Sequence, residues 1–200
     1  MKEKIAKLLL ESNSVKINPE DLFTWTSGIK SPIYCDTRIL NSLPEIREEI
    51  VDGFVNIAKN LDFDLVAGAA TGGISWAAYT AQKLNKPMVY VRKKAKGHGT
   101  GKKVEGLLRE GQKVLMIEDI ISTGGSSILA TEGVRNEGGI IEDCLAILWY
   151  EFPDTDRAYK KSDINLQTLS DFSALISVSD FSKETKDFLM KFQEDPRGWV

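Results

Sequence analysis

The sequence contains little that would support a metal centre, a disulfide framework or a membrane span. It has two cysteines, Cys35 and Cys144, and one histidine in 200 residues, with no CxxC spacing. Both cysteines are therefore expected to be reduced thiols of a cytoplasmic protein. No apolar run is long enough to cross a bilayer, and the apolar spacing near the N-terminus predicts a short helix instead of a signal peptide.

An excess of one charge is also missing. The chain has 26 basic and 29 acidic residues, a formal net charge of −3, and the two signs are mixed along its length. A general nucleic-acid-binding or membrane-binding surface is therefore not expected. With 42% hydrophobic residues and no linker, repeat or low-complexity tract, we expect one domain over residues 1–200.

Apolar segments alternate with Gly-rich turns and amphipathic segments after residue 44. Strands are expected to end at Gly68, Arg92 and Asp119, and CLAILWY and INLQTL read as two later strands. Helices are expected at about 44–57, 74–84, 126–137 and 183–193. This order predicts an α/β fold with a central, mostly parallel sheet flanked by helices on both faces. Ligands of such sheets bind beyond the carboxyl ends of the strands, so the loops that follow these strands are the candidate site.

The segment VLMIEDIISTGGSS, residues 114–127, contains the most specific pattern. Its small residues at 122–126 allow successive N–H groups and a helix N-terminus to bind one phosphate. Glu118 and Asp119 stand at the end of an apolar strand, where carboxylates are costly unless they are paired. The two hydroxyls of a ribose would be suitable donors to them. No GxxxxGK or GxGxxG is present, which argues against a Walker loop or a dinucleotide-binding fold.

A second segment, YVRKKAKGHGTGKKVEG at residues 90–106, gathers basic side chains around glycines. Cations near a departing pyrophosphate favour the transition state, because negative charge grows on that group as its bond breaks. The glycines suit a loop that opens and closes, and His98 could stabilise or protonate the leaving group. From the residues alone, a solvated basic loop without a catalytic role remains the alternative.

Both segments resemble motifs of one enzyme family. Two acids, two aliphatic residues and a Thr/Gly/Ser loop after a buried strand are similar to the phosphoribosyl pyrophosphate (PRPP) motif of type I phosphoribosyltransferases. The pattern R-K-x-x-K-x-H-G at 92–99 is similar to the catalytic loop of the orotate phosphoribosyltransferases within that family. TSGIKSPIYCD at 26–36 is similar to their orotate-binding segment. The resemblance implies the type I fold, with a small hood from about 1–40 and 164–200 and a PRPP-binding core at about 44–150.

The resemblance also implies an activity and a set of site residues. The activity is transfer of the 5-phosphoribosyl group of PRPP to orotate, which gives orotidine 5′-phosphate and pyrophosphate in de novo pyrimidine biosynthesis. Glu118 and Asp119 would bind the ribose hydroxyls, and residues 122–126 the 5′-phosphate. The residues expected to bind PRPP are Arg92, Lys93, Lys96, His98, Glu118, Asp119, Ile120, Ile121, Ser122, Thr123, Gly124, Gly125 and Ser126. Lys96, His98 and Asp119 are also expected to act in catalysis.

The family further implies how the metal ion and a second subunit take part. Mg²⁺ would be held mainly by PRPP itself, with no direct protein ligand. The protein would be a homodimer in which the catalytic loop completes the partner subunit's site.

The base is expected to contact the N-terminal segment. The resemblance implies contacts from Lys30, Tyr34 and Cys35, with Ser122 close to the ring. No arginine ends the CLAILWY strand to pair with the orotate carboxylate. Arg38 is therefore our hypothesis for a bidentate partner of that group.

The pyrophosphate is expected to lie on a turn of small residues, Ala70, Thr71 and Gly72, whose N–H groups can bind it. Some family members carry a lysine at the position of Thr26 or a Tyr-Lys pair in this turn. The chain has neither, so those contacts are not carried over.

Three other interpretations are considered. A purine phosphoribosyltransferase would share the PRPP loop but has no reason to carry RKKAKGHG together with SGIKSPIYCD. A PRPP-sensing regulator should have a nucleic-acid-binding region or lack the catalytic loop. A structural α/β module would leave the Glu118–Asp119 pair and the basic loop unexplained.

Overall fold

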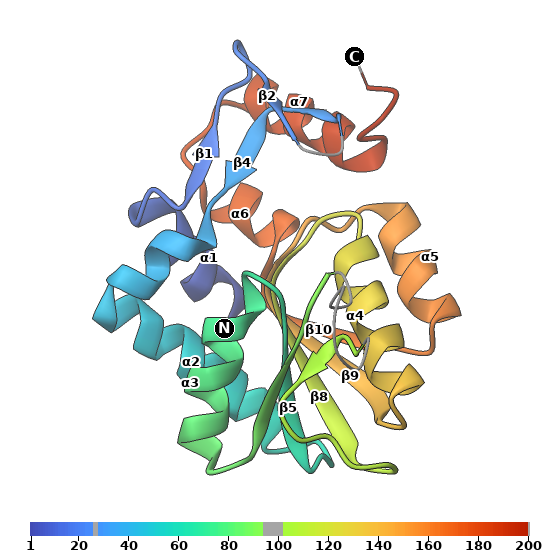
Figure 1. Ribbon diagram of the computed structural model, residues 1–200. Coiled ribbons are helices and arrows are strands. Elements are labelled where there is room, and N and C mark those ends of the chain that lie inside the picture. The colour runs from blue at the N-terminus through green and yellow to red at the C-terminus, as the bar shows by residue number, and fades with distance from the viewer. Residues whose placement is uncertain (26–27, 94–101, 200) are drawn as a thin grey trace.

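The computed structural model describes residues 1–25, 28–93 and 102–199. Its centre is a six-stranded sheet with the order β10-β9-β8-β5-β6-β7 (Figure 1). The strands are β5 (Leu65–Ala69), β6 (Met88–Val91), β7 (Val104–Glu105), β8 (Lys113–Ile121), β9 (Ile140–Trp149) and β10 (Asn165–Asp171). All pair in parallel except β7, which is antiparallel to β6 at one edge. The predicted mostly parallel sheet is confirmed.

Helices cover both faces of this sheet, as predicted. In Figure 1, α2 (Pro44–Ala58) and α3 (Gly73–Leu84) lie on one side, and α4 (Gly125–Asn136) and α5 (Pro153–Lys161) on the other. Strand β8 shows why both faces are apolar. Leu115 and Ile117 join the core under α2 and α3, whereas Val114 and Met116 join the core under α4. Alternate residues of one strand thus fill two separate layers.

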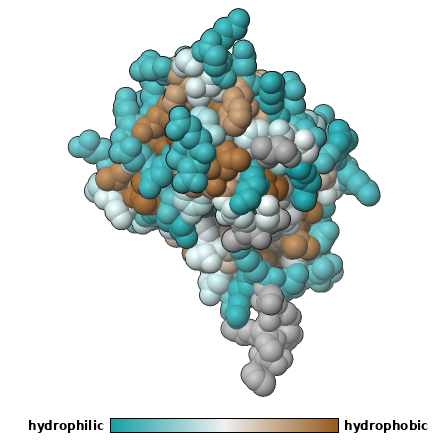
Figure 2. Space-filling model, turned by 90° about the horizontal axis from the view of Figure 1, so that it is seen from above, coloured by the Kyte–Doolittle hydropathy of each residue, from teal (hydrophilic) through white to brown (hydrophobic). Residues whose placement is uncertain are grey.

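Segments from the two ends of the chain come together above the carboxyl ends of the strands, at the top of Figure 1. The N-terminal elements there are β1 (Val15–Ile17), β2 (Phe23–Thr24), β3 (Lys30–Ser31), β4 (Ile33–Cys35) and the 3₁₀ helix η1 (Thr37–Ser42), and the C-terminal element is α7 (Lys183–Glu194). We call this group of elements the hood. Seen from above, apolar side chains lie among polar ones on it (Figure 2). Between the hood and the sheet lie α1 (Lys2–Glu11), which contacts β10, and α6 (Phe172–Val178).

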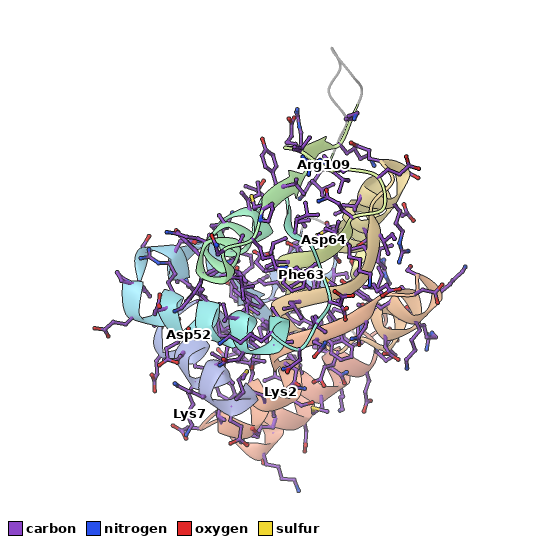
Figure 3. The ribbon with its side chains drawn as sticks, turned by 90° about the horizontal axis from the view of Figure 1, so that it is seen from below. Lys2, Lys7, Asp52, Phe63, Asp64 and Arg109 are labelled. Carbon is purple, nitrogen blue, oxygen red and sulfur yellow. The ribbon has the colours of Figure 1, made fainter. Side chains whose placement is uncertain are left out.

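At the opposite end of the sheet, where the parallel strands begin, Lys113 and Asp64 are joined by two hydrogen bonds. The amide of Lys113 donates to Asp64 Oδ2 at 2.8 Å, and the Asp64 amide donates to the Lys113 carbonyl at 2.8 Å. Figure 3 shows this end from below, with Phe63 and Asp64 just before β5. The loops suited to bind ligands therefore lie at the hood end.

Two sequence predictions need correction. β8 continues two residues beyond Asp119, because Ile120 and Ile121 pair with Leu148 and Trp149 of β9. The two acids thus lie within the last four residues of β8 and not at its end. The short helices α5 and α6 and the two small hairpins of the hood were not predicted. Across the described part of the chain, no helix has the length and apolar character needed to span a bilayer.

Candidate active site

The loop between β8 and α4 has the form expected for a phosphate site. Gly124 has a φ of +75°, a conformation that L side chains rarely adopt, and a Cβ there would lie 2.9 Å from Tyr159 Cε2. Thr123, Gly125 and Ser126 are exposed at the N-terminus of α4. Their N–H groups are therefore accessible to an anion, and the helix dipole favours negative charge there.

Helix α5 supports this loop through hydrogen bonds. Thr155 Oγ1 donates to the carbonyl of Ser122 at 2.7 Å, and the hydroxyl of Tyr159 lies 2.5 Å from Ser127 Oγ. Ser127 Oγ in turn donates to the Gly124 carbonyl at 2.9 Å. Thr155, Tyr159 and Ser127 are buried, so the loop is fixed by a dry hydrogen-bond network. The sequence analysis did not identify Thr155 and Tyr159.

We expect Thr155→Val to weaken PRPP binding. Valine keeps the shape of threonine but leaves the Ser122 carbonyl without its donor, which loosens the phosphate loop. The KM for PRPP should rise by about fivefold, the equivalent of one net hydrogen bond, while the KM for the second substrate stays within about twofold. Thr155→Ser, which keeps the hydroxyl, is the control. Steady-state kinetics in which a KM for PRPP is unchanged in Thr155→Val would contradict this role for α5.

The two adjacent acids of β8 point to opposite faces of the sheet, as neighbouring strand residues do. Glu118 is only 6% exposed, and burial, followed by the charge of Asp119, raises its pKa well above the usual range. Asp119 is half-buried and faces the hood. Of the two carboxylates, Asp119 is therefore the one that a ligand above the sheet reaches directly.

Asp119 is held between the hood and the turn after β5. Thr37 Oγ1, buried at the start of η1, donates to Asp119 Oδ2 at 2.8 Å. On the other side, a Cβ at Gly72 would lie 2.2 Å from the same oxygen. Gly72 thus has no side chain because the carboxylate occupies that space. Thr37 was missed by the sequence analysis, since only the folding of the hood brings it to β8.

The turn after β5 packs directly on β8. Its first amide, that of Ala70, donates to the Val91 carbonyl at 2.9 Å, and Gly73 begins α3. A Cβ at Gly73 would lie 2.3 Å from the Ile117 carbonyl. Thr71 is exposed, and Ala70 and Gly72 are half-buried. The predicted pyrophosphate turn therefore lies beside Asp119, with part of its backbone open to a ligand.

The residues at both ends of the basic segment are held by defined contacts. β6 and β7 pair, Arg92 Nη1 lies 3.2 Å from Glu105 Oε1, and the amides of Lys103 and Val104 both donate to Glu137 Oε1. Lys93 is exposed. Lys96 and His98 lie outside the described residues, and their predicted roles remain predictions.

The predicted base-binding residues lie on the hairpins of the hood. Lys30 Nζ donates to Thr24 Oγ1 at 2.7 Å, and Tyr34 is exposed, with its ring 5.6 Å from that of Phe23. Cys35 is a free thiol whose pKa is raised to about 12, mainly by burial. The charge of Asp119 contributes to this rise in the pKa of Cys35.

Arg38 lies next to Tyr34 but is bound to a neighbour. Its Nε and Nη2 donate to the carboxylate of Asp36 at 2.6 and 2.9 Å, and Nη2 lies 3.5 Å from the Tyr34 hydroxyl. This pairing lowers the pKa of Asp36. A guanidinium has five N–H donors, so these three contacts leave donors for a ligand carboxylate.

Among the described residues, no group of three or more His, Cys, Asp and Glu side chains could hold a metal ion.

Comparisons with known proteins agree with this geometry. The family model described as "Phosphoribosyl transferase domain" matches residues 38–177. The orotate phosphoribosyltransferase of Staphylococcus saprophyticus is 46% identical over 189 residues, which are 94% of this chain and 93% of that protein. That of Enterococcus faecalis is 44% identical over 203 aligned residues, covering 98% of this chain and 97% of the relative.

A solved structure also matches. The orotate phosphoribosyltransferase from Aeropyrum pernix superposes with a TM-score of 0.76 and 28% identity, covering 86% of this chain and 96% of that chain. Fold, site geometry and relatives of nearly equal length lead to one conclusion. This chain belongs to the orotate phosphoribosyltransferase family and has the type I phosphoribosyltransferase fold.

Proposed function

We propose that the protein transfers the 5-phosphoribosyl group of PRPP to orotate, giving orotidine 5′-phosphate and pyrophosphate, in de novo pyrimidine biosynthesis. One observation carries the proposal. Asp119 contacts Thr37 of the hood and packs on Gly72 of the pyrophosphate turn, two residues before the end of the strand that leads into the phosphate loop. A single carboxylate thus joins the predicted sites of the base, the pyrophosphate and the ribose phosphate.

PRPP would be bound along these three loops. The N–H groups of residues 122–126 bind the 5′-phosphate, and the turn at Ala70–Gly72 binds the pyrophosphate. Asp119 accepts hydrogen bonds from the ribose hydroxyls. Glu118 remains the predicted second acceptor for the ribose hydroxyls, and because its side chain is buried on the other face of β8 it would have to reorient to reach them.

The reaction is a displacement at the anomeric carbon. The ring nitrogen of orotate forms the new bond to this carbon as the bond to the pyrophosphate oxygen breaks. Orotate is anionic once its ring nitrogen has lost its weakly acidic proton, so positioning and charge stabilisation account for the rate. Lys96 and His98 are proposed to stabilise the departing pyrophosphate, together with Arg92 and Lys93.

Mg²⁺ is proposed to enter with PRPP, held mainly by the pyrophosphate and ribose oxygens, which are the hard donors that this ion prefers. It would offset the negative charge of the leaving group. A homodimer is proposed in which the basic loop of one subunit completes the site of the other. We place the reaction in the cytoplasm, where free thiols such as Cys35 and Cys144 persist.

Arg38→Ala is expected to raise the KM for orotate by about tenfold, the scale of losing a charge-assisted bidentate contact. The KM for PRPP should change much less, because the side-chain contacts of Arg38 among the described residues are with Asp36 and Tyr34 and none is with the phosphate loop. Arg38→Lys should restore part of the affinity for orotate, since lysine keeps the positive charge but cannot donate two parallel hydrogen bonds to one carboxylate. An unchanged orotate KM in Arg38→Ala would refute the assignment of the carboxylate to Arg38.

The proposed function itself is tested by identifying the products. Purified protein, PRPP, Mg²⁺ and orotate should yield orotidine 5′-phosphate and pyrophosphate in equal amounts. Pyrophosphate without the nucleotide would indicate hydrolysis of PRPP instead of transfer.

A further inference from the structure

The residues after α7 fold back onto the hood in a defined turn. The amides of Arg197 and Gly198 both donate to Asp195 Oδ1, at 3.3 and 3.0 Å. The Gly198 backbone lies close to the same side chain, since a Cβ there would lie 2.4 Å from Asp195 Oδ2. The turn directs Trp199 toward the hairpin formed by β2 and β3. Figure 1 shows this end of the chain next to β2 and α7.

Trp199 makes one polar and two aromatic contacts there. Its Nε1 donates to the backbone carbonyl of Lys30 at 3.0 Å. Its ring meets those of Phe188 and Phe192 edge-on, with centroids 4.9 and 5.2 Å apart. These are favourable arrangements for aromatic pairs, and the indole N–H has the partner that a half-buried tryptophan requires.

Trp25 repeats this arrangement from the other side of α7. Its Nε1 donates to the carbonyl of Ile33 at 3.2 Å, and its ring lies edge-on to Phe192 at 5.9 Å. Phe192 is fully buried and contacts both indoles. The two tryptophans that pack on Phe192 therefore donate to the carbonyls of Lys30 and Ile33. Both carbonyls belong to the segment that also carries Tyr34 and Cys35.

The two ends of this segment are fixed by different contacts, since β4 pairs with β1 over Ile33–Cys35 and Ile33 is fully buried. β2 and β3 are two residues each, and a two-stranded hairpin of that length is marginal on its own. Lys30 and Tyr34 themselves are exposed. The indole hydrogen bonds and the aromatic cluster therefore add to the strand pairing in positioning this backbone, and their contribution is largest at Lys30, where the pairing is shortest.

We propose that Trp199 and Trp25 are positioning residues for the base. They set the orientation of Lys30 and Tyr34, and thereby the affinity for an anionic pyrimidine, without touching it. The inference rests on the proposed function and gives a role to the residues that follow α7. PRPP binding is not affected, because the phosphate loop and the pyrophosphate turn make no contact with Trp199 among the interactions of the described residues.

The test compares Trp199→Phe with the wild type in the orotate assay. Phenylalanine keeps an aromatic ring but removes the donor to Lys30, so the KM for orotate should rise about fivefold. The KM for PRPP should stay within about twofold, since no phosphate contact is lost. Trp199→Ala, which also removes the ring, should raise the orotate KM further, by about tenfold or more.

Trp149→Phe is the matched control. It is the same substitution, but Trp149 Nε1 is buried with no hydrogen-bond partner among the described residues. Its orotate KM should match that of the wild type. A purely structural role for Trp199 would lower the melting temperature and leave the ratio of the two KM values unchanged, which would overturn the proposal. Absence of orotate turnover by the wild type would instead overturn the proposed function.

Discussion

Lys96→Ala combined with His98→Ala is expected to lower kcat by about a thousandfold or more while leaving the protein folded. Both residues are proposed to act on the leaving pyrophosphate, where charge develops only as the bond breaks. Loss of a general acid or of one preorganised charge contact costs on the order of a hundredfold each. The measurement is the rate of orotate consumption at saturating PRPP and Mg²⁺. A loss below about tenfold would contradict the catalytic role of the basic loop.

The control for this variant removes two charges elsewhere. Lys59→Ala with Lys161→Ala changes exposed lysines remote from Asp119 and should leave kcat unchanged. A mixing experiment tests whether the loop is shared between subunits. If it is, the double variant mixed with Asp119→Asn, each inactive alone, should recover about a quarter of wild-type activity through mixed dimers with one intact site. No recovery after subunit exchange would contradict a shared loop.

Gly72→Ala is expected to lower kcat/KM for PRPP by about a hundredfold with a small change in stability. The added methyl would lie 2.2 Å from Asp119 Oδ2, and the carboxylate must move away from the ribose. A displacement of about 1 Å at a reacting group can cost this much. The fold should tolerate the change, since the atom that moves is the end of a side chain.

Gly53→Ala in α2 provides a matched control. Its methyl would meet Leu169 Cδ2 at 3.0 Å, again the end of a side chain, but far from the carboxylates. Its kcat/KM should equal that of the wild type. A Gly72→Ala enzyme within about threefold of wild type would show that the position of Asp119 does not limit the reaction.

The sheet and its main loops were predictable because their signals are local. β8 alternates its apolar residues between two cores, and the acids and the small-residue loop follow in one continuous stretch. The predicted end of β8 was two residues too early, because the motif places the end of the strand at the two acids. Ile120 and Ile121 are β-branched and continue the ladder with β9.

The supports of the site were not predictable in the same way. Thr155 and Tyr159 lie four residues apart on α5, and both face the phosphate loop. Neither belongs to a periodic pattern of apolar residues that would have predicted this helix from the sequence. Two-residue strands such as β2 and β3 are too short to show alternation. Thr37 and Trp199 reach their partners across 82 and 169 positions of sequence, which only tertiary folding specifies.

The most direct test of the central claim is the fall of orotate's ultraviolet absorbance when wild-type protein is mixed with PRPP and Mg²⁺. Adenine and hypoxanthine are offered in parallel reactions. The account predicts steady consumption of orotate that requires PRPP and no conversion of the purines. Conversion of a purine with orotate untouched would contradict it, and would mean that the hood binds a different base beside the same PRPP site.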